Sequence, residues 1–267
     1  MPRRLLTGFA LALLATASAD ASTIRVHYEV SLLGLTIGTA SVTGTIDPAS
    51  YRIEADARLS GLASVLSSSR SAATAAGALS GNRVLPAAYA TTSANATTTR
   101  TIRMALDAGT VTGLEIVPPW DANVPRVPIT DAHKQHVLDP LSAFLMTLPA
   151  GGAFGPAACG RTLPVFDGGV RIDLALAYAG TRHVTAKGFE GDAAVCTVRY
   201  IPVSGQRVES KSSKFMADNR NLEAWVVPLP GTRLAFPFRI SVKTMVGTVV
   251  VEADELAVEN ASRAATP

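Results

Sequence analysis

Two histidines stand three residues apart in a segment that also carries carboxylates. His133 and His136 could share one helical turn, and with Asp131 and Asp139 nearby they could hold a metal ion. The segment follows a proline-rich loop, and the other two histidines are remote in sequence. We therefore expect a solvated loop here, and neither a metal nor another cofactor.

The same segment contains the residue types of a hydrolase triad, Ser142, His136 and Asp139. A serine nucleophile needs a histidine base that a carboxylate orients. No G-x-S-x-G elbow surrounds Ser142, and triad partners that converge in space need not cluster within seven residues of sequence. We assign no catalytic residue and expect a protein that is not an enzyme; a hydrolase using Ser142 with His136, or using Asp167, is the third alternative.

Two further residues are weak candidates for contact with a ligand. Asp167 precedes two glycines and stands six residues before Asp173, so the pair could be a two-carboxylate site, but a turn entering a strand is the simpler interpretation. Trp120 lies in a proline-rich loop, where it is either an exposed contact residue or packs on the sheet. The ligand-binding residues themselves are not predicted.

Cys159 and Cys196 are the only cysteines. In an exported chain they are expected to form a disulfide, because oxidising compartments let thiols pair. The alternative is two buried free thiols. No C-x-x-C motif indicates a redox-active pair.

The first residues have the layout of a secretory signal. Arg3 and Arg4 are followed by an apolar run from Leu5 to Ala15 and then by small residues, so cleavage is expected after residue 19 or after residue 21. A membrane anchor would need roughly 20 apolar residues, and a lipoprotein would need a cysteine at this point. We predict a soluble periplasmic protein that is neither membrane-spanning after cleavage nor a lipoprotein.

The charge balance excludes a polyanion partner. Removal of residues 1–19 lowers Lys plus Arg from 24 to 22 against 21 Asp plus Glu, a net charge of +1. Charges of both signs are interspersed along the chain, so we expect no nucleic-acid binding.

Alternating apolar and polar residues predict antiparallel strands. Residues 24–30 and 51–59 alternate strictly, residues 60–90 give a weaker strand signal, and further strands are expected at 101–106, 111–117, 170–178, 195–203, 223–227, 236–242 and 245–252. Long helices between strands are missing from this pattern. It indicates a mainly β fold, a large curved antiparallel sheet forming an open barrel, clam or β-spiral, over residues 22–260 as one domain, with a flexible tail at 261–267.

One short helix is expected near residues 139–147. Asp139 can cap free backbone amides, Pro140 suits the first helical position, and Pro149 ends the helix.

Several segments, in this order and spacing, resemble one bacterial envelope family, domain of unknown function 3108. They are Tyr28 to Gly38, Asp139 to Ser142, Val165 to Gly169, Cys196 with Arg199, Tyr200 and Pro202, Ala224 to Val227, and Pro237 to Arg239. The resemblance covers nearly the whole chain after the signal segment. It implies a periplasmic, largely antiparallel β-protein of Gram-negative bacteria with no assigned activity.

The strand pattern also suggests a function. A large curved sheet must fill its concave side, and small Ala, Val and Thr side chains leave room for an apolar pocket. Our leading hypothesis is a non-enzymatic protein that holds an apolar or lipid-like ligand, or docks another envelope protein, in cell-envelope maintenance. The alternative is a structural or interaction module without a ligand.

Overall fold

The computed structural model describes residues 21–59, 69–150 and 154–260. The predicted signal peptide, over residues 1–19 or 1–21, lies outside the described residues except for residue 21, and the predicted tail at 261–267 also lies outside them, so both stay predictions.

Strands dominate the described residues. The first seven are β1 (Ser22–Leu32), β2 (Leu35–Ile46), β3 (Ser50–Leu59), β4 (Arg70–Ser80), β5 (Arg83–Ala94), β6 (Thr99–Asp107) and β7 (Thr110–Val117). The others are β8 (Met146–Thr147), β9 (Arg161–Phe166), β10 (Arg171–Ala186), β11 (Phe189–Ser204), β12 (Leu222–Pro228), β13 (Leu234–Thr244) and β14 (Gly247–Asn260). The mainly β prediction is confirmed, and β4 and β5 confirm the weaker strand signal over residues 69–90; residues 60–68 lie outside the described ranges.

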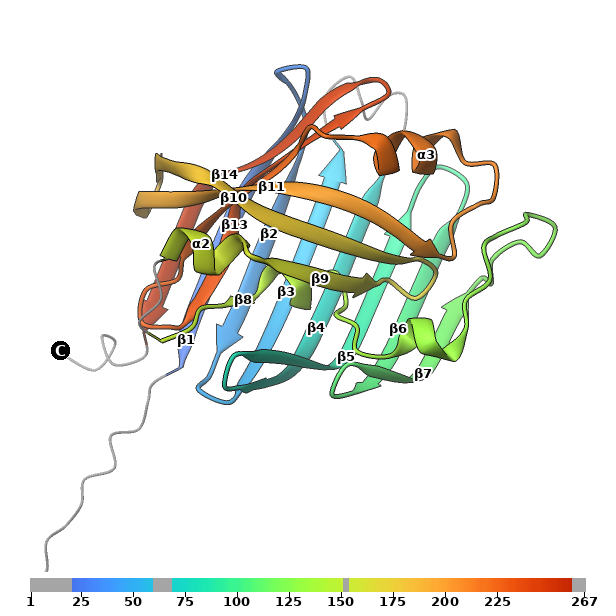
Figure 1. Cartoon of the computed structure of the whole chain (residues 1–267), viewed down its shortest axis with the longest axis horizontal. Coiled ribbons are helices and arrows are strands. Elements are labelled where there is room, and N and C mark those ends of the chain that lie inside the picture. Colours follow the sequence, from blue (N-terminus) through green and yellow to red (C-terminus); the bar gives the residue numbers. More distant parts are fainter. Residues whose placement is uncertain (1–20, 60–68, 151–153, 261–267) are drawn as a thin grey trace, which may run out of the picture.

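All fourteen strands belong to one antiparallel sheet. Its order is β7-β6-β5-β4-β3-β2-β1-β14-β13-β12-β11-β10-β9, with β8 paired to β13 off this path. The two chain halves therefore join through β1 and β14, which pair from Ser22 with Asn260 to Leu32 with Val249. Figure 1 shows the sheet curled on itself, so that β9, β10 and β11 cross in front of the strands of the first half. β7 and β9 are the two edges of this order, so the sheet is open.

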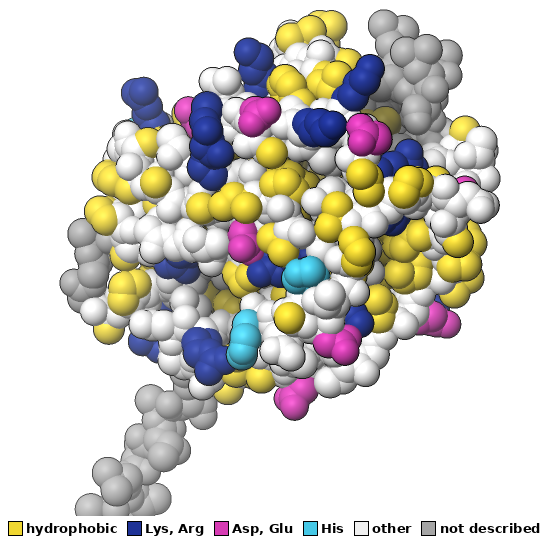
Figure 2. All heavy atoms as spheres, turned by 45° about the vertical axis from the view of Figure 1, so that its right-hand side comes forward, with side chains coloured by type: hydrophobic (Ala, Val, Ile, Leu, Met, Phe, Trp, Pro, Cys, Tyr) yellow, Lys and Arg dark blue, Asp and Glu magenta, His cyan; other side chains and the backbone are white. Residues whose placement is uncertain are grey.

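The alternation of the sequence explains which side chains the curled sheet encloses. In β3, Tyr51 and Ile53 are buried, whereas Arg52 and Glu54 are exposed. The outer surface in Figure 2 carries cationic and acidic side chains interspersed with apolar ones, which agrees with the charge pattern of the sequence.

The interior has two hydrophobic clusters. The first includes Ile24, Ile53 and Phe236 and lies between the strands of the first half and those near the C-terminus. The second includes Cys159 and Cys196 and covers the other face of strands β9 to β13. The segment 137–146 contributes side chains to both clusters.

Because of this two-sided packing, the segment forms a shorter helical turn than the helix that the sequence predicts near 139–147. The Asp139 carboxylate does cap backbone amides, but the segment forms only one 3-10 turn, η2 (Ser142–Phe144), before strand β8. Leu141 and Leu145 face the first cluster while Ala143 and Met146 face the second. A segment that must bury side chains on opposite sides over six residues gains little from an amphipathic helix, which has one apolar face.

Three other helical segments lie among the described residues. They are the 3-10 turn η1 (Asp131–Lys134) and the α-helices α2 (Phe154–Cys159) and α3 (Lys211–Asp218), and the sequence analysis did not predict them. In α3 the Ser210 hydroxyl accepts a hydrogen bond from the Ser213 amide at 3.1 Å, which is an N-cap. No helix in the described ranges has the length and apolar character needed to cross a membrane.

Candidate functional site: an apolar pocket

An apolar pocket of about 550 Å³ lies against the face of β9 to β13 that carries the second cluster. Strand residues form most of its wall. The segment from Pro140 to Met146 forms another part, and Met216 of α3 also lines the pocket. Only Asp167, Glu223, Ser241 and the Tyr200 hydroxyl bring polar side-chain atoms to this lining. Its size falls in the range of small-molecule binding sites.

Cross-strand pairs build the floor of the pocket. Leu174 and Leu176 of β10 lie opposite Tyr200 and Val198 of β11. Leu222 and Ala224 of β12 likewise lie opposite Val242 and Ile240 of β13. Because residues two apart in a strand point to the same face, these alternating apolar residues all project into one space.

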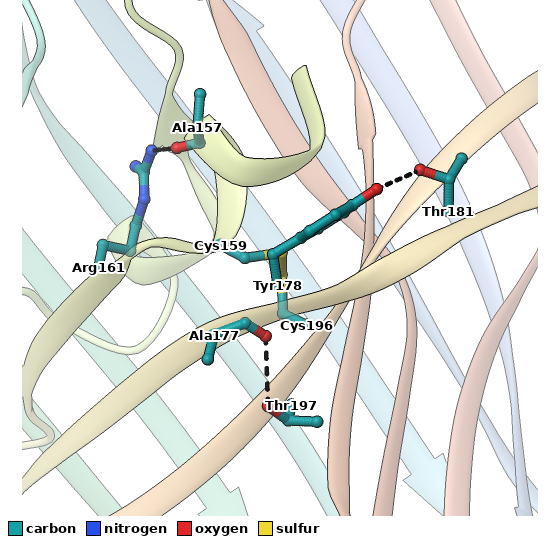
Figure 3. Close-up of a disulfide and its surroundings, with 8 residues drawn as sticks. All are labelled: Ala157, Cys159, Arg161, Ala177, Tyr178, Thr181, Cys196 and Thr197. Carbon is teal, nitrogen blue, oxygen red and sulfur yellow. Dashed lines mark hydrogen bonds between the residues drawn. A yellow bond between two sulfur atoms is a disulfide. The ribbon is translucent and has the colours of Figure 1, made fainter. Parts of the chain in front are cut away.

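A disulfide fixes α2 beside this floor. Cys159, the last residue of α2, is bonded to Cys196 of β11, with 5.4 Å between the Cα atoms and both side chains fully buried. Figure 3 shows the bond with Tyr178 beside it, and the predicted disulfide is therefore confirmed. Cys196 stands two residues before Val198 on the same strand face, so the bond holds α2 next to the pocket.

Arg161 ties the same region together. Its guanidinium donates to the Ala157 carbonyl of α2 at 2.5 Å (Figure 3). It also donates to the Thr147 carbonyl of β8 at 2.7 Å. Burial lowers the pKa of Arg161. One side chain thus joins two short elements that close the second cluster.

A buried polar network anchors the Pro140 to Met146 wall. The Asp139 carboxylate accepts the amides of Leu141 at 3.0 Å and Ser142 at 2.9 Å, and it also accepts the Ser142 hydroxyl. The Tyr51 hydroxyl of β3 lies 2.6 Å from Ser142 Oγ. Burial raises the pKa of the Asp139 carboxyl and that of the Tyr51 phenol. This network fixes the position from which Ala143 and Phe144 line the pocket.

The same network contains two of the three residues that the sequence suggests as a hydrolase triad. Ser142 and Asp139 are in direct contact, whereas a triad places the histidine between the serine and the carboxylate, and both residues are fully buried. Their third partner is Tyr51, while His136 is exposed. A nucleophile must reach its substrate, and Ser142 has no exposed surface in this structure.

The histidine segment is arranged for local structure. His133 Nδ1 accepts the Thr130 amide at 3.1 Å, and Asp131 pairs with Lys134 at 3.1 Å. His136 has a positive φ of 53° and points away from the core. Within the described ranges, no group of three or more His, Cys, Asp or Glu side chains is close enough to hold a metal.

The Asp167 carboxylate caps a turn, as the simpler interpretation expects. It accepts the amides of Gly169 at 2.8 Å and Val170 at 2.7 Å, around Gly168 at φ +97°. Asp173 pairs with Arg171 instead of with Asp167. The turn places Asp167 on the border of the apolar pocket.

Trp120 is packed, not free in its loop. The guanidinium of Arg100 lies 3.9 Å from the ring centroid and that of Arg126 lies 4.6 Å away, both as cation–π contacts. With Arg100 it lines a second, polar cavity of about 510 Å³, which shares Pro140 and Asp167 with the apolar pocket. The indole N–H is buried and meets no acceptor among the described residues.

Sequence reasoning missed the pocket residues although it found their strands. The alternation at 170–178 and 195–203 shows that Leu174, Leu176 and Val198 share faces. The alternation cannot show that other side chains leave a pocket over this face. The pocket depends on the distance of α3 and the Pro140 segment from the face. The N-cap at Ser210 was the one local signal for α3.

A curled antiparallel sheet that stays open and encloses an apolar pocket defines a β-barrel-like protein. The chain belongs to the family described as "Protein of unknown function (DUF3108)", which matches residues 23–254. The resemblance noted from the sequence is thereby confirmed.

One solved structure supports the fold. A β-barrel-like protein of domain of unknown function DUF1849 from Brucella abortus is similar at 9% identity and a TM-score of 0.50, covering 89% of this chain and 98% of that one. A candidate lipoprotein from Parabacteroides distasonis has 10% identity and a TM-score of 0.27, with 89% and 94% covered. No curated protein matches the sequence.

Proposed function

We propose that this protein is a non-enzymatic periplasmic protein that holds an apolar, lipid-like ligand in support of cell-envelope maintenance. The observation that carries the proposal is the 550 Å³ pocket, whose wall is built mostly from apolar side chains. Such a wall offers few hydrogen-bond partners to a polar substrate but favours a hydrocarbon chain.

The energetics favour a long chain. Each buried methylene contributes about 0.8 kcal/mol, so fourteen contribute about 11 kcal/mol before costs. Association costs on the order of 4–15 kcal/mol, which short chains do not offset. Half-buried wall residues such as Ile172 and Leu174 leave one side of the pocket accessible for entry.

Two features support the proposed periplasmic location. The predicted signal segment directs export, and the disulfide between Cys159 and Cys196 is stable in an oxidising compartment. A disulfide that fixes a helix beside the pocket suits a protein that works outside the cytoplasm.

The test is binding of a fluorescent fatty acid to the purified protein and to a variant with a filled pocket. Ala224→Phe places a ring in the pocket, and Ala177→Phe adds the same ring at an exposed position of β10 as the control. We expect Ala224→Phe to abolish binding and Ala177→Phe to retain it. If the unsubstituted protein binds no fatty acid, or if both variants bind equally well, the pocket is not the ligand site.

A further inference from the structure

The most exposed large hydrophobic side chains lie on two hairpin tips. Leu33, between β1 and β2, and Leu35, the first residue of β2, are 69% and 72% exposed. Met245 and Val246, between β13 and β14, are 59% and 73% exposed. These are the four highest exposures of any large hydrophobic residue in the described part of the chain. Exposed apolar residues that gather in one place mark an interaction site more often than scattered ones do.

The two tips form one continuous patch, which we call the apex. The Leu33 amide donates to the Thr248 carbonyl at 3.0 Å, which joins the first tip to the start of β14. A Cβ added to Gly247 would lie 2.7 Å from Leu33 Cδ2, so the leucine side chain rests on the second tip. Both hairpins project from the same end of the sheet at the top of Figure 1, and Figure 2 shows apolar side chains at that end.

The turn at Leu33 adds an argument from backbone strain. Leu33 and Gly34 have φ values of 52° and 81°, the pattern of a two-residue hairpin turn that favours Asn-Gly. A branched side chain at positive φ is strained. A small polar residue would be more stable than the exposed leucine at this turn position. The leucine therefore indicates that this turn is a contact site.

Cations surround the apex. Lys243 precedes the second tip, and Arg220 is next to Asn219, whose side-chain amide donates to the Lys243 carbonyl at 2.7 Å. Arg58 and Arg70 lie directly opposite each other across β3 and β4 at the same end of the sheet.

All four cations are exposed, and none forms an ion pair with another described residue. Asp56 stands two residues from Arg58 and Asp218 two residues from Arg220, and the exposed Glu29 pairs with Thr39 on the side away from Arg58. Like charges directly opposite each other in a sheet are destabilising.

The spacing of these groups fits a lipid surface. Arg58 lies opposite Thr39, four residues from Leu35 along β2, or about 13 Å at 3.3 Å per residue. Interfacial segments insert their apolar side chains about 5–10 Å into the boundary between headgroups and acyl chains. Cations about 13 Å behind the tips lie just beyond this insertion depth, on the side of the headgroup phosphates.

We propose that the apex docks the protein on an anionic lipid surface. The four apolar side chains enter the acyl boundary, and the four cations face the lipid phosphates. The docking stands independently of the ligand proposal, but it also serves it. Val242 of the pocket wall is three residues from Met245 on the same hairpin, so a docked protein holds its pocket near the lipid.

The test is flotation of the protein, purified from a periplasmic extract, with vesicles of phosphatidylcholine alone or mixed with phosphatidylglycerol. The apex variant carries Leu35→Ser and Val246→Ser. The control carries Ile201→Ser and Val208→Ser, two residues that are 43% and 48% exposed outside the apex. A charge variant carries Arg58→Gln and Lys243→Gln.

We expect the protein and the control to float with anionic vesicles. Loss of two inserted side chains should lower the apex variant's partition coefficient about tenfold or more. The charge variant should lose its preference for phosphatidylglycerol, and added salt should have the same effect on the unsubstituted protein.

Three results would overturn the proposal. The first is no flotation with anionic vesicles, and the second is equal flotation of the apex and control variants. The third is a dimer that the apex substitutions dissociate without any vesicle binding, which would assign the apex to a second copy of the chain. A native mass spectrum of the same sample reports whether the pocket is occupied, so the two proposals fail separately.

Discussion

Replacement of Asp139 tests the buried network that holds the pocket wall. Asp139→Ala leaves two buried donors without an acceptor, the amides of Leu141 and Ser142, and leaves the Ser142 hydroxyl with Tyr51 as its remaining partner. An unsatisfied buried donor costs about 1–3 kcal/mol, and these costs do not add fully. We expect the free energy of unfolding to fall by about 3–5 kcal/mol and fatty-acid affinity to fall with it, because Ala143 and Phe144 line the pocket.

Asp139→Asn is the matched control, and the pH dependence of stability distinguishes it from the unsubstituted protein. The asparagine oxygen still accepts both amides, and its NH2 group donates to Ser142 Oγ. Burial raises the native pKa of Asp139, so the native state binds this proton more tightly than the unfolded chain does. The resulting stabilisation is fully present below the ordinary pKa of about 3.9 and is lost as pH rises through the raised native pKa.

The assay is urea unfolding of the three proteins over a pH series. Asp139→Asn should lack the loss of stability with rising pH that the unsubstituted protein shows in this window. If Asp139→Ala costs less than about 1 kcal/mol, or if Asp139→Asn keeps the original pH slope, the network does not support the wall as described.

Three further predictions concern the disulfide, the tight turns and the ligand. Replacement of both Cys159 and Cys196 by Ala should lower the free energy of unfolding by about 4 kcal/mol, since their separation of 37 residues closes a long loop; urea unfolding with equal midpoints for both proteins would contradict this. Gly205→Ala, at φ +85° with the new Cβ 2.1 Å from the Gly169 carbonyl oxygen, should destabilise far more than Gly81→Ala, at φ +59° with open space. Thermal unfolding compares the two, and equal midpoints would rule out the close approach. Fatty-acid affinity should rise up to about fourfold per added methylene until the pocket is full; titration with a chain-length series should show this, and no dependence on length would exclude an apolar chain site.

The strands were predictable because their signal is local. Alternation at Tyr51 and Ile53 against Arg52 and Glu54 survives in the fold, since one face of the sheet is buried and the other is solvated. The pairing of Cys159 with Cys196 was predictable from export and from the count of two cysteines.

The site was less predictable because it depends on contacts between distant segments. Ser142 and Asp139 are residue types found in a catalytic triad. Only the fold reveals that Tyr51, 91 residues away from Ser142, completes their network. Likewise, the face of Leu174 and Val198 becomes a pocket only because α3 and the Pro140 segment cover it incompletely.

The most direct test of the central claim is native mass spectrometry, with lipid extraction, of the protein purified gently from a periplasmic fraction. We predict a near-stoichiometric bound apolar molecule that is absent from the Ala224→Phe variant. A mass equal to that of the polypeptide alone, together with no uptake of added fatty acid, would contradict the claim that the pocket between β9 and β13 holds a lipid-like ligand.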